Sequence, residues 1–174
     1  MYSTQQSGPQ KNFDYALEDG HLTESEQIYL SSGPGRFDAA YHATSTSGFH
    51  GSVPEGTGDR PTLFVGTSAK DTVRGDHGDE VFKTLGGDDT IIIDGGMDWV
   101  YAGDGADTLE INKAWADFEI TYRDGTYYLV ERGESITDRD AVVACDVEFY
   151  DFSNGGLEAG NLLNVDPTDI RFAD

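Results

Sequence analysis

Residues 66–110 read GTSAKDTVR, GDHGDEVFK, TLGGDDTII, IDGGMDWVY and AGDGADTLE, five consecutive blocks of nine residues with no gap between them. The sixth position of every block is acidic, and the eighth is always a large apolar residue. Glycine fills the fourth position in four of the five blocks, the exception being Ala69. A fixed period of this kind is the signature of a repeat architecture, in which neighbouring repeats bury one another's apolar side chains.

The period predicts how the blocks stack. Nine residues allow a turn of about six residues followed by a strand of about three, whose middle side chain points inward. Two blocks then form one coil of a flattened helix, and alternate blocks stack along the same edge. We therefore predict an all-β fold: a short parallel β-roll of five repeats, capped by antiparallel hairpin strands and preceded by an irregular N-terminal arm.

The sixth-position acids predict a metal centre. Because stacked strands lie about 4.8 Å apart, Asp71, Asp89 and Asp107 should form one ladder of carboxylates. Glu80 and Asp98 should form a second ladder on the opposite edge. Two bare carboxylates separated by about 5 Å repel by about 3 kcal/mol at an effective dielectric constant of about 20. Hard cations must fill such a ladder, and calcium, with about six to eight oxygen ligands in a flexible geometry, suits it better than magnesium.

The blocks resemble the calcium-binding nonapeptide repeats of the RTX (repeats-in-toxin) haemolysin-type family, whose pattern is Gly-Gly-x-Gly-x-Asp-x-apolar-x and whose fold is a parallel β-roll. TLGGDDTII and AGDGADTLE match best, whereas the first block lacks two glycines and Glu80 replaces the family's aspartate. The resemblance implies one ion between blocks two apart, and therefore two to three Ca²⁺ ions. The acid pairs are Asp71 with Asp89, Glu80 with Asp98, and Asp89 with Asp107, of which the last should be the best formed.

The predicted metal-site residues are the sixth-position acids together with the fourth-position glycines, which let the turns aim carbonyl oxygens at an ion. They are Asp71, Gly78, Glu80, Gly87, Asp89, Gly96, Asp98, Gly105 and Asp107.

The rest of the chain divides into segments of different composition and hydrophobic pattern. Residues 1–62 are predicted to be an irregular arm with one short helix over about residues 23–30, because Thr23 and Glu26 match a capping box. The aromatic residues Phe37, Tyr41 and Phe49 should anchor this arm. Residues 63–112 should form the roll and residues 161–174 a tail.

Residues 113–160 are predicted to form an antiparallel β cap that covers the open edge of the roll. Two alternating runs flank Asp124-Gly125, which is a strong signal for a hairpin with a tight turn. The segment also resembles the β-rich cap that often follows these repeats in secreted family members.

Composition excludes several classes of partner. The chain of 174 residues carries 33 acidic and 11 basic residues, a net charge of −22 at pH 7. Nucleic-acid binding requires a basic surface, and no apolar run approaches the ~18 residues of a membrane span, so we expect neither partner. The lone cysteine, Cys145, should be a buried apolar residue rather than a reactive thiol. His42 and His50 have no catalytic motif around them, and we expect no enzyme activity.

We expect a non-enzymatic calcium-binding protein whose roll is ordered by Ca²⁺ and which acts in extracellular attachment or assembly. Its partner would be another protein or further copies of itself, contacted through the arm. The resemblance implies export with an uncleaved C-terminal signal, and the first residues lack a cleavable one. Two alternatives stay open: a subunit of a larger assembly, such as a phage virion (capsid decoration or tail component) or a surface layer, and a calcium-binding C-terminal module of a secreted hydrolase.

Overall fold

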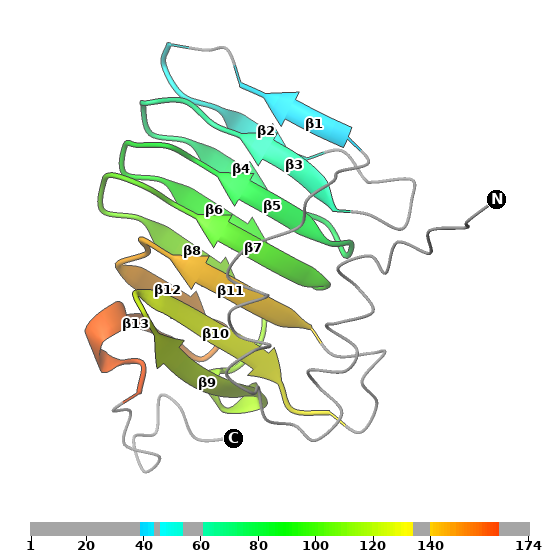
Figure 1. Ribbon diagram of the computed structural model, residues 1–174, viewed down its shortest axis with the longest axis vertical. Helices are drawn as coiled ribbons and strands as arrows, with labels where there is room; N and C mark the ends of the chain where they lie inside the picture. Colours follow the sequence, from blue (N-terminus) through cyan, green and yellow to red (C-terminus); the bar gives the residue numbers. More distant parts are fainter. Residues whose placement is uncertain (1–38, 44–45, 54–60, 134–139, 164–174) are drawn as a thin grey trace, which may run out of the picture.

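The computed structural model describes residues 39–43, 46–53, 61–133 and 140–163. In chain order they form β1 (Ala39–His42), β2 (His50–Ser52), β3 (Thr62–Val65), β4 (Thr72–Arg74), β5 (Glu80–Lys83), β6 (Thr90–Ile93), β7 (Met97–Tyr101), β8 (Thr108–Ile111), the 3-10 helix η1 (Trp115–Asp117), β9 (Phe118–Arg123), β10 (Thr126–Glu131), β11 (Ala141–Cys145), β12 (Phe149–Phe152), β13 (Gly155–Glu158) and the 3-10 helix η3 (Ala159–Asn161). The strands make two sheets that face each other and stack as successive coils (Figure 1).

Consecutive strands of the roll belong to different sheets, so each coil contributes one strand to each sheet. The seven-stranded sheet has the order β1-β3-β5-β7-β11-β10-β9, and the six-stranded sheet has the order β13-β12-β8-β6-β4-β2. Thr72 pairs with Thr90 and Thr90 with Thr108, which means that the parallel register advances by two blocks per coil. The predicted stacking of alternate blocks is confirmed: β4, β6 and β8 share one edge, and β5 and β7 share the other.

The main core lies between the two sheets. The eighth-position residues of all five blocks point into it and are at most 1% exposed: Val73, Phe82, Ile91, Val100 and Leu109. Leu129 and Tyr150 of the cap join the same cluster. Because burying one such side chain stabilises the fold by about 1.5–3 kcal/mol, this single column supplies much of the roll's stability.

A second apolar cluster lies on the outer face of the seven-stranded sheet. Val81 and Trp99 directly precede the core residues Phe82 and Val100, and neighbouring side chains on a strand point to opposite faces. Val81 and Trp99 pack with residues of the cap, including Tyr128, and all three are buried. The nonapeptide pattern does not predict this cluster, because it marks only one inward position per block.

The roll begins earlier than predicted. β1 and β2 lie within residues 1–62, which were expected to be irregular, and they pair in parallel with β3 and β4. Within the described residues the roll therefore starts at Ala39 rather than at residue 63. An open strand edge offers backbone partners that let a segment of low strand propensity join the sheet. Phe49 is an anchor as expected, with its ring centroid 4.9 Å from that of Phe64.

The expected helix near residues 23–30 and Phe37 lie outside the described residues. Tyr41, the remaining predicted anchor, is exposed on β1.

The cap is not purely antiparallel, which corrects the prediction for residues 113–160. The hairpin of β9 and β10 around Asp124-Gly125 is present. However, β11 pairs in parallel with β7 and β12 pairs in parallel with β8, so these two strands continue the roll by one coil. The antiparallel strands β10 and β13 then pair with β11 and β12, and β9 follows β10. Because β11 and β12 pair in parallel with β7 and β8, they supply hydrogen-bond partners to the backbone N–H and C=O groups of the last coil.

The start of the predicted tail packs against the cap. Leu162 is fully buried, and the Trp115 indole N–H donates to its carbonyl oxygen at 3.3 Å. In the part of the chain that the structure describes, no helix has the length and apolar character needed to cross a membrane.

Candidate metal centre

The five predicted acids form two buried ladders in the predicted order. The backbone N–H of Asp71 donates to Asp89 Oδ1 at 2.7 Å, and that of Asp89 donates to Asp107 Oδ1 at 2.8 Å. On the opposite edge the Glu80 N–H donates to Asp98 Oδ1 at 3.0 Å. All five side chains are at most 1% exposed. The turn before each strand thus places the sixth-position carboxylate against the backbone of the preceding coil.

In each of three ladder carboxylates, one oxygen has no hydrogen-bond partner among the described residues. Within the described residues, Oδ2 of Asp89, Asp98 and Asp107 is buried and unpaired. A buried charged oxygen without a partner costs more than about 1–3 kcal/mol, so it requires a proton or a cation. These oxygens, two on one edge of the roll and one on the other, fit bound hard cations, which are the groups that the sequence predicts.

Asp71 differs from the other members of its ladder. Its carboxylate accepts the Phe49 N–H at 2.5 Å, the Thr67 N–H at 2.7 Å and the Thr67 hydroxyl at 2.9 Å. Both of its oxygens are bonded by protein groups, so it is the acid least free to bind a cation. These bonds favour the Asp89–Asp107 pair over the Asp71–Asp89 pair as a metal site, and that order stays a prediction.

Gly87, Gly96 and Gly105 let successive turns pack closely, whereas a Cβ on Gly78 would lie nearest Asp76 Oδ1 and Glu80 Oε1 of its own block. A Cβ on Gly96 would overlap the carbonyl oxygen of Gly78, and one on Gly105 would overlap that of Gly87. Gly96 (φ +87°), Gly105 (φ +155°) and Gly87 (φ +113°) all have positive φ angles. A Cβ on Gly105 would also lie 3.3 Å from Asp107 Oδ1, so the Gly87 carbonyl lies near that ladder acid. Calcium accepts carbonyl and carboxylate oxygens in one coordination shell.

The side chains alone do not complete a metal site. Among the described residues, His, Cys, Asp and Glu side chains form no group of three or more arranged to hold an ion. The centre is instead a series of carboxylate pairs that would bind an ion together with the stacked turn carbonyls.

Asp76 belongs to the second ladder, although the sequence did not predict it. Its Oδ1 accepts the Gly78 N–H at 2.6 Å, its own N–H donates to Glu80 Oε2 at 3.4 Å, and its Oδ2 is buried and unpaired within the described chain. Asp76 occupies the second position of its block, where the family pattern has glycine. Three other blocks also lack glycine there, and one of them has Asp94, so the sequence did not single out Asp76.

Burial raises the pKa values of the ladder acids. The pKa of Asp89 rises to about 6, chiefly through burial, with Asp107 and Asp71 adding repulsion. The pKa of Glu80 rises to about 8 through burial and the nearby Asp76 carboxylate. Burial also raises the pKa of Asp98, with repulsion from Glu80 as the next cause. Burial raises the pKa of Asp107 as well, and the hydrogen bond from the Asp89 N–H, which lowers it, opposes a smaller repulsion from Glu148. Ionised carboxylates without a cation therefore destabilise the folded state.

The raised pKa values predict that acid stabilises the metal-free protein. The folded pKa values of about 6 for Asp89 and about 8 for Glu80 exceed the ordinary values of 3.8 and 4.5, so the folded state binds more protons than the unfolded state. Stability should consequently fall as pH rises from about 4.5 to about 8. Urea denaturation in chelator at pH 5 and pH 8 should give a higher unfolding free energy at pH 5, and the reverse order would contradict the burial of ionised ladder acids.

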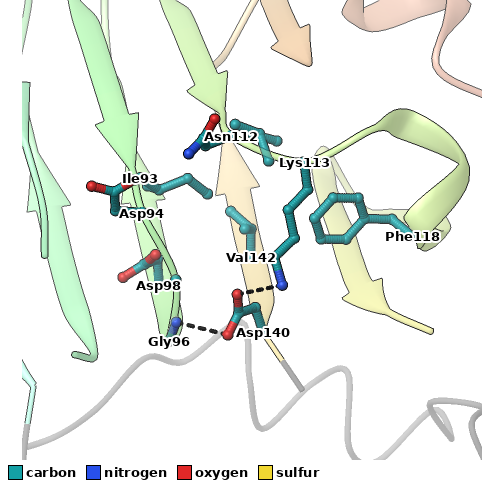
Figure 2. Close-up of a pocket in the computed structure, with 11 residues that line it drawn as sticks. Ile93, Asp94, Gly96, Asp98, Asn112, Lys113, Phe118, Asp140 and Val142 are labelled. Atoms are coloured by element: carbon teal, nitrogen blue, oxygen red, sulfur yellow. Dashed lines mark hydrogen bonds and ion pairs between the residues drawn. The ribbon is translucent and has the colours of Figure 1, made fainter. Parts of the chain in front are cut away.

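The second ladder ends in an ion-pair network rather than in another acid. A cavity of about 100 Å³ lies beside Asp98, and Lys113 and Asp140 also line it (Figure 2). The Lys113 ammonium lies 2.8 Å from Asp140 Oδ2 and 2.5 Å from Glu131 Oε1. Asp140 Oδ1 accepts the Gly96 N–H at 3.0 Å. The Lys113 ammonium thus pairs with two acids of the cap at the end of this edge.

The remaining candidate residues are two histidines and a cysteine. His42 and His50 are exposed on β1 and β2, which belong to different sheets. Cys145 is half-buried, and burial together with Asp146 raises the pKa of its thiol to about 11, so the thiol is protonated at neutral pH.

Comparisons with known proteins are sparse. No family model matches this sequence, and no curated protein matches it. Among solved structures, the chain is similar to the crystal structure of extracellular lipase LipA from Serratia marcescens, at 23% sequence identity and a TM-score of 0.48. The match covers 55% of this chain and 15% of that chain, so this chain spans only a small part of the lipase's length. The β-roll assignment rests on the strand pairings described above.

Proposed function

We propose that this chain is a non-enzymatic calcium-binding β-roll protein, and that calcium holds its stacked coils together. The observation that carries the proposal is that Oδ2 of Asp89, Asp98 and Asp107 is buried and unpaired within the described residues. The strands that follow Asp89 and Asp107 pair in register on one edge of the roll, and Asp98 lies beside Glu80 on the other. The resemblance of the repeats to the RTX family supports the same conclusion from the sequence.

Each ion would neutralise a carboxylate pair and link two neighbouring coils. When bound, calcium supplies positive charge and accepts several oxygen ligands at flexible distances. The ladder acids would provide the charged ligands, and the turn carbonyls beside Gly96 and Gly105 would provide the neutral ones. The ion thereby replaces repulsion between coils with attraction, and metal binding becomes folding free energy.

We propose that the calcium-ordered roll acts outside the cell as a rigid element for attachment or assembly. Extracellular calcium modules are tuned to dissociation constants of about 0.1–1 mM, and a centre built from carboxylate pairs and carbonyls fits that range. A net charge of −22 favours a calcium-rich medium, in which cations also screen the remaining acids.

Calcium titration tests the proposal directly. Isothermal titration calorimetry of the chelator-treated protein with CaCl₂ should show saturable binding of two or more ions. MgCl₂ at the same concentration should bind more weakly, because magnesium requires a tight octahedron and keeps its waters. Absence of calcium binding at millimolar concentration would refute the proposal. Hydrolysis in a screen of esters, peptides and polysaccharides would refute its non-enzymatic part.

A further inference from the structure

The carboxylate ladder on the edge of β4, β6 and β8 continues into the cap. β12 pairs in parallel with β8, with Phe149 opposite Thr108. Glu148 therefore lies opposite Asp107. Asp107 lies opposite Asp89 in the same way one coil earlier. The nonapeptide period cannot reveal this relation, because Glu148 follows Asp107 by 41 residues and the ladder acids follow one another by 18.

Glu148 reproduces the hydrogen bonds of a repeat block. The Asp107 N–H donates to Glu148 Oε2 at 2.8 Å, compared with 2.8 Å and 2.7 Å for the two bonds higher in the ladder. The Phe149 N–H donates to the Asp107 carbonyl at 3.0 Å, and Thr108 N–H donates to the Asp89 carbonyl at 2.9 Å in the same way. The cap thus copies both the backbone and the carboxylate contacts of the repeats.

The charges around this position favour a cation. Asp107 is fully buried with an unpaired Oδ2 within the described residues, and Glu148 is half-buried beside it. Repulsion from Glu148, Asp88 and Asp146 adds to burial in raising the pKa of Asp107, so these acids all lie close enough to interact with it.

The opposite edge provides a contrast within the same molecule. There the residue paired with Asp98 in the cap is Val142, whose side chain, unlike that of Glu148, has no oxygen to offer an ion. The nearby acid Asp140 is bound instead by the Lys113 ammonium at 2.8 Å. The second ladder therefore ends at Asp98 with a protein cation beside it, whereas the first ladder ends with an acid.

We propose that Glu148 is a calcium ligand and that it forms, with Asp107, one cation site more than the five repeats provide. This inference rests on the proposed function. The site would link the cap to the roll, because Asp107 precedes β8 and Glu148 precedes β12. Calcium would then hold the last strand pair in the way that it holds the coils of the roll.

The test compares Glu148→Gln with Asp151→Asn, a control that removes one exposed acid from β12 itself. Glutamine keeps an oxygen that accepts the Asp107 N–H but lacks the charge. Native mass spectrometry and calorimetry with CaCl₂ should show that Glu148→Gln either loses one ion or binds one of its ions with an affinity reduced by more than about tenfold. The reason is that the charge of the ligands sets calcium affinity. Asp151→Asn should retain the stoichiometry and affinity of the unmodified chain. The same number and affinity of ions in Glu148→Gln would overturn the inference.

The outcome separates this inference from the proposed function. If the unmodified chain binds no calcium, the proposed function fails and the inference fails with it. If calcium binds fully to Glu148→Gln, only the inference fails. Should Glu148→Gln not fold in calcium, Glu148→Asp keeps the charge and withdraws it by one methylene group. That variant should bind one ion more weakly, and unchanged affinity for every ion would also overturn the inference.

Discussion

Adding millimolar calcium to the chelator-treated protein should increase its β-sheet circular dichroism signal and raise its melting temperature by about 5–10 °C for each site that is saturated. A ligand present at about 100 times its dissociation constant stabilises the folded state by about 2.7 kcal/mol. For a chain of this length, each kcal/mol raises the melting temperature by about 2–4 °C. The gain should be large because the ladder acids repel one another without an ion.

Magnesium at equal concentration and sodium chloride at equal ionic strength are the controls for this experiment. Screening of surface charge would raise stability with either salt, whereas occupied sites respond to calcium far more strongly. A spectrum and melting temperature that are the same in calcium and in chelator would contradict calcium-coupled folding.

Asp89→Asn should remove most of the calcium response, because Asp89 is the middle acid of its ladder and belongs to two predicted sites. The calcium-induced rise in melting temperature should shrink by the contribution of two sites, which is about 10–20 °C. Asparagine keeps an oxygen that can accept the Asp71 N–H, which Asp89 Oδ1 accepts at 2.7 Å. In chelator at pH 8 the variant should be at least as stable as the unmodified chain, because it removes a buried charge whose pKa is raised to about 6.

Asp71→Asn is the matched control for Asp89→Asn. The Asp71 carboxylate already accepts bonds from Phe49 and Thr67, so it contributes less to a cation site. Its replacement should reduce the calcium response less than Asp89→Asn does. A larger effect at Asp71, or a loss of stability in chelator at Asp89, would contradict the stacking order and the role of Asp89 as a metal ligand.

Much of the roll could be predicted from the sequence because its contacts repeat at a fixed spacing. The eighth-position residues, such as Ile91 and Leu109, are buried in the core as expected, and their neighbours Asp89 and Asp107 stack as expected. A register that advances by two blocks per coil makes every such contact a consequence of the nine-residue period. The candidate metal centre could be located for the same reason.

The tertiary structure alone decided what happens where the period ends. The parallel pairing of β11 and β12, the inclusion of β1 and β2 in the roll, and the outer cluster around Trp99 all depend on contacts between segments with no shared spacing. The two ladders end differently: the Asp71–Asp89–Asp107 ladder ends beside the acid Glu148, and the Glu80–Asp98 ladder ends near the Lys113 ammonium. The sequence by itself determined the repeated coil and its acids, because those contacts are periodic. The closure of each edge depended on which strand of the cap pairs with the last coil, and only the folded chain decides that.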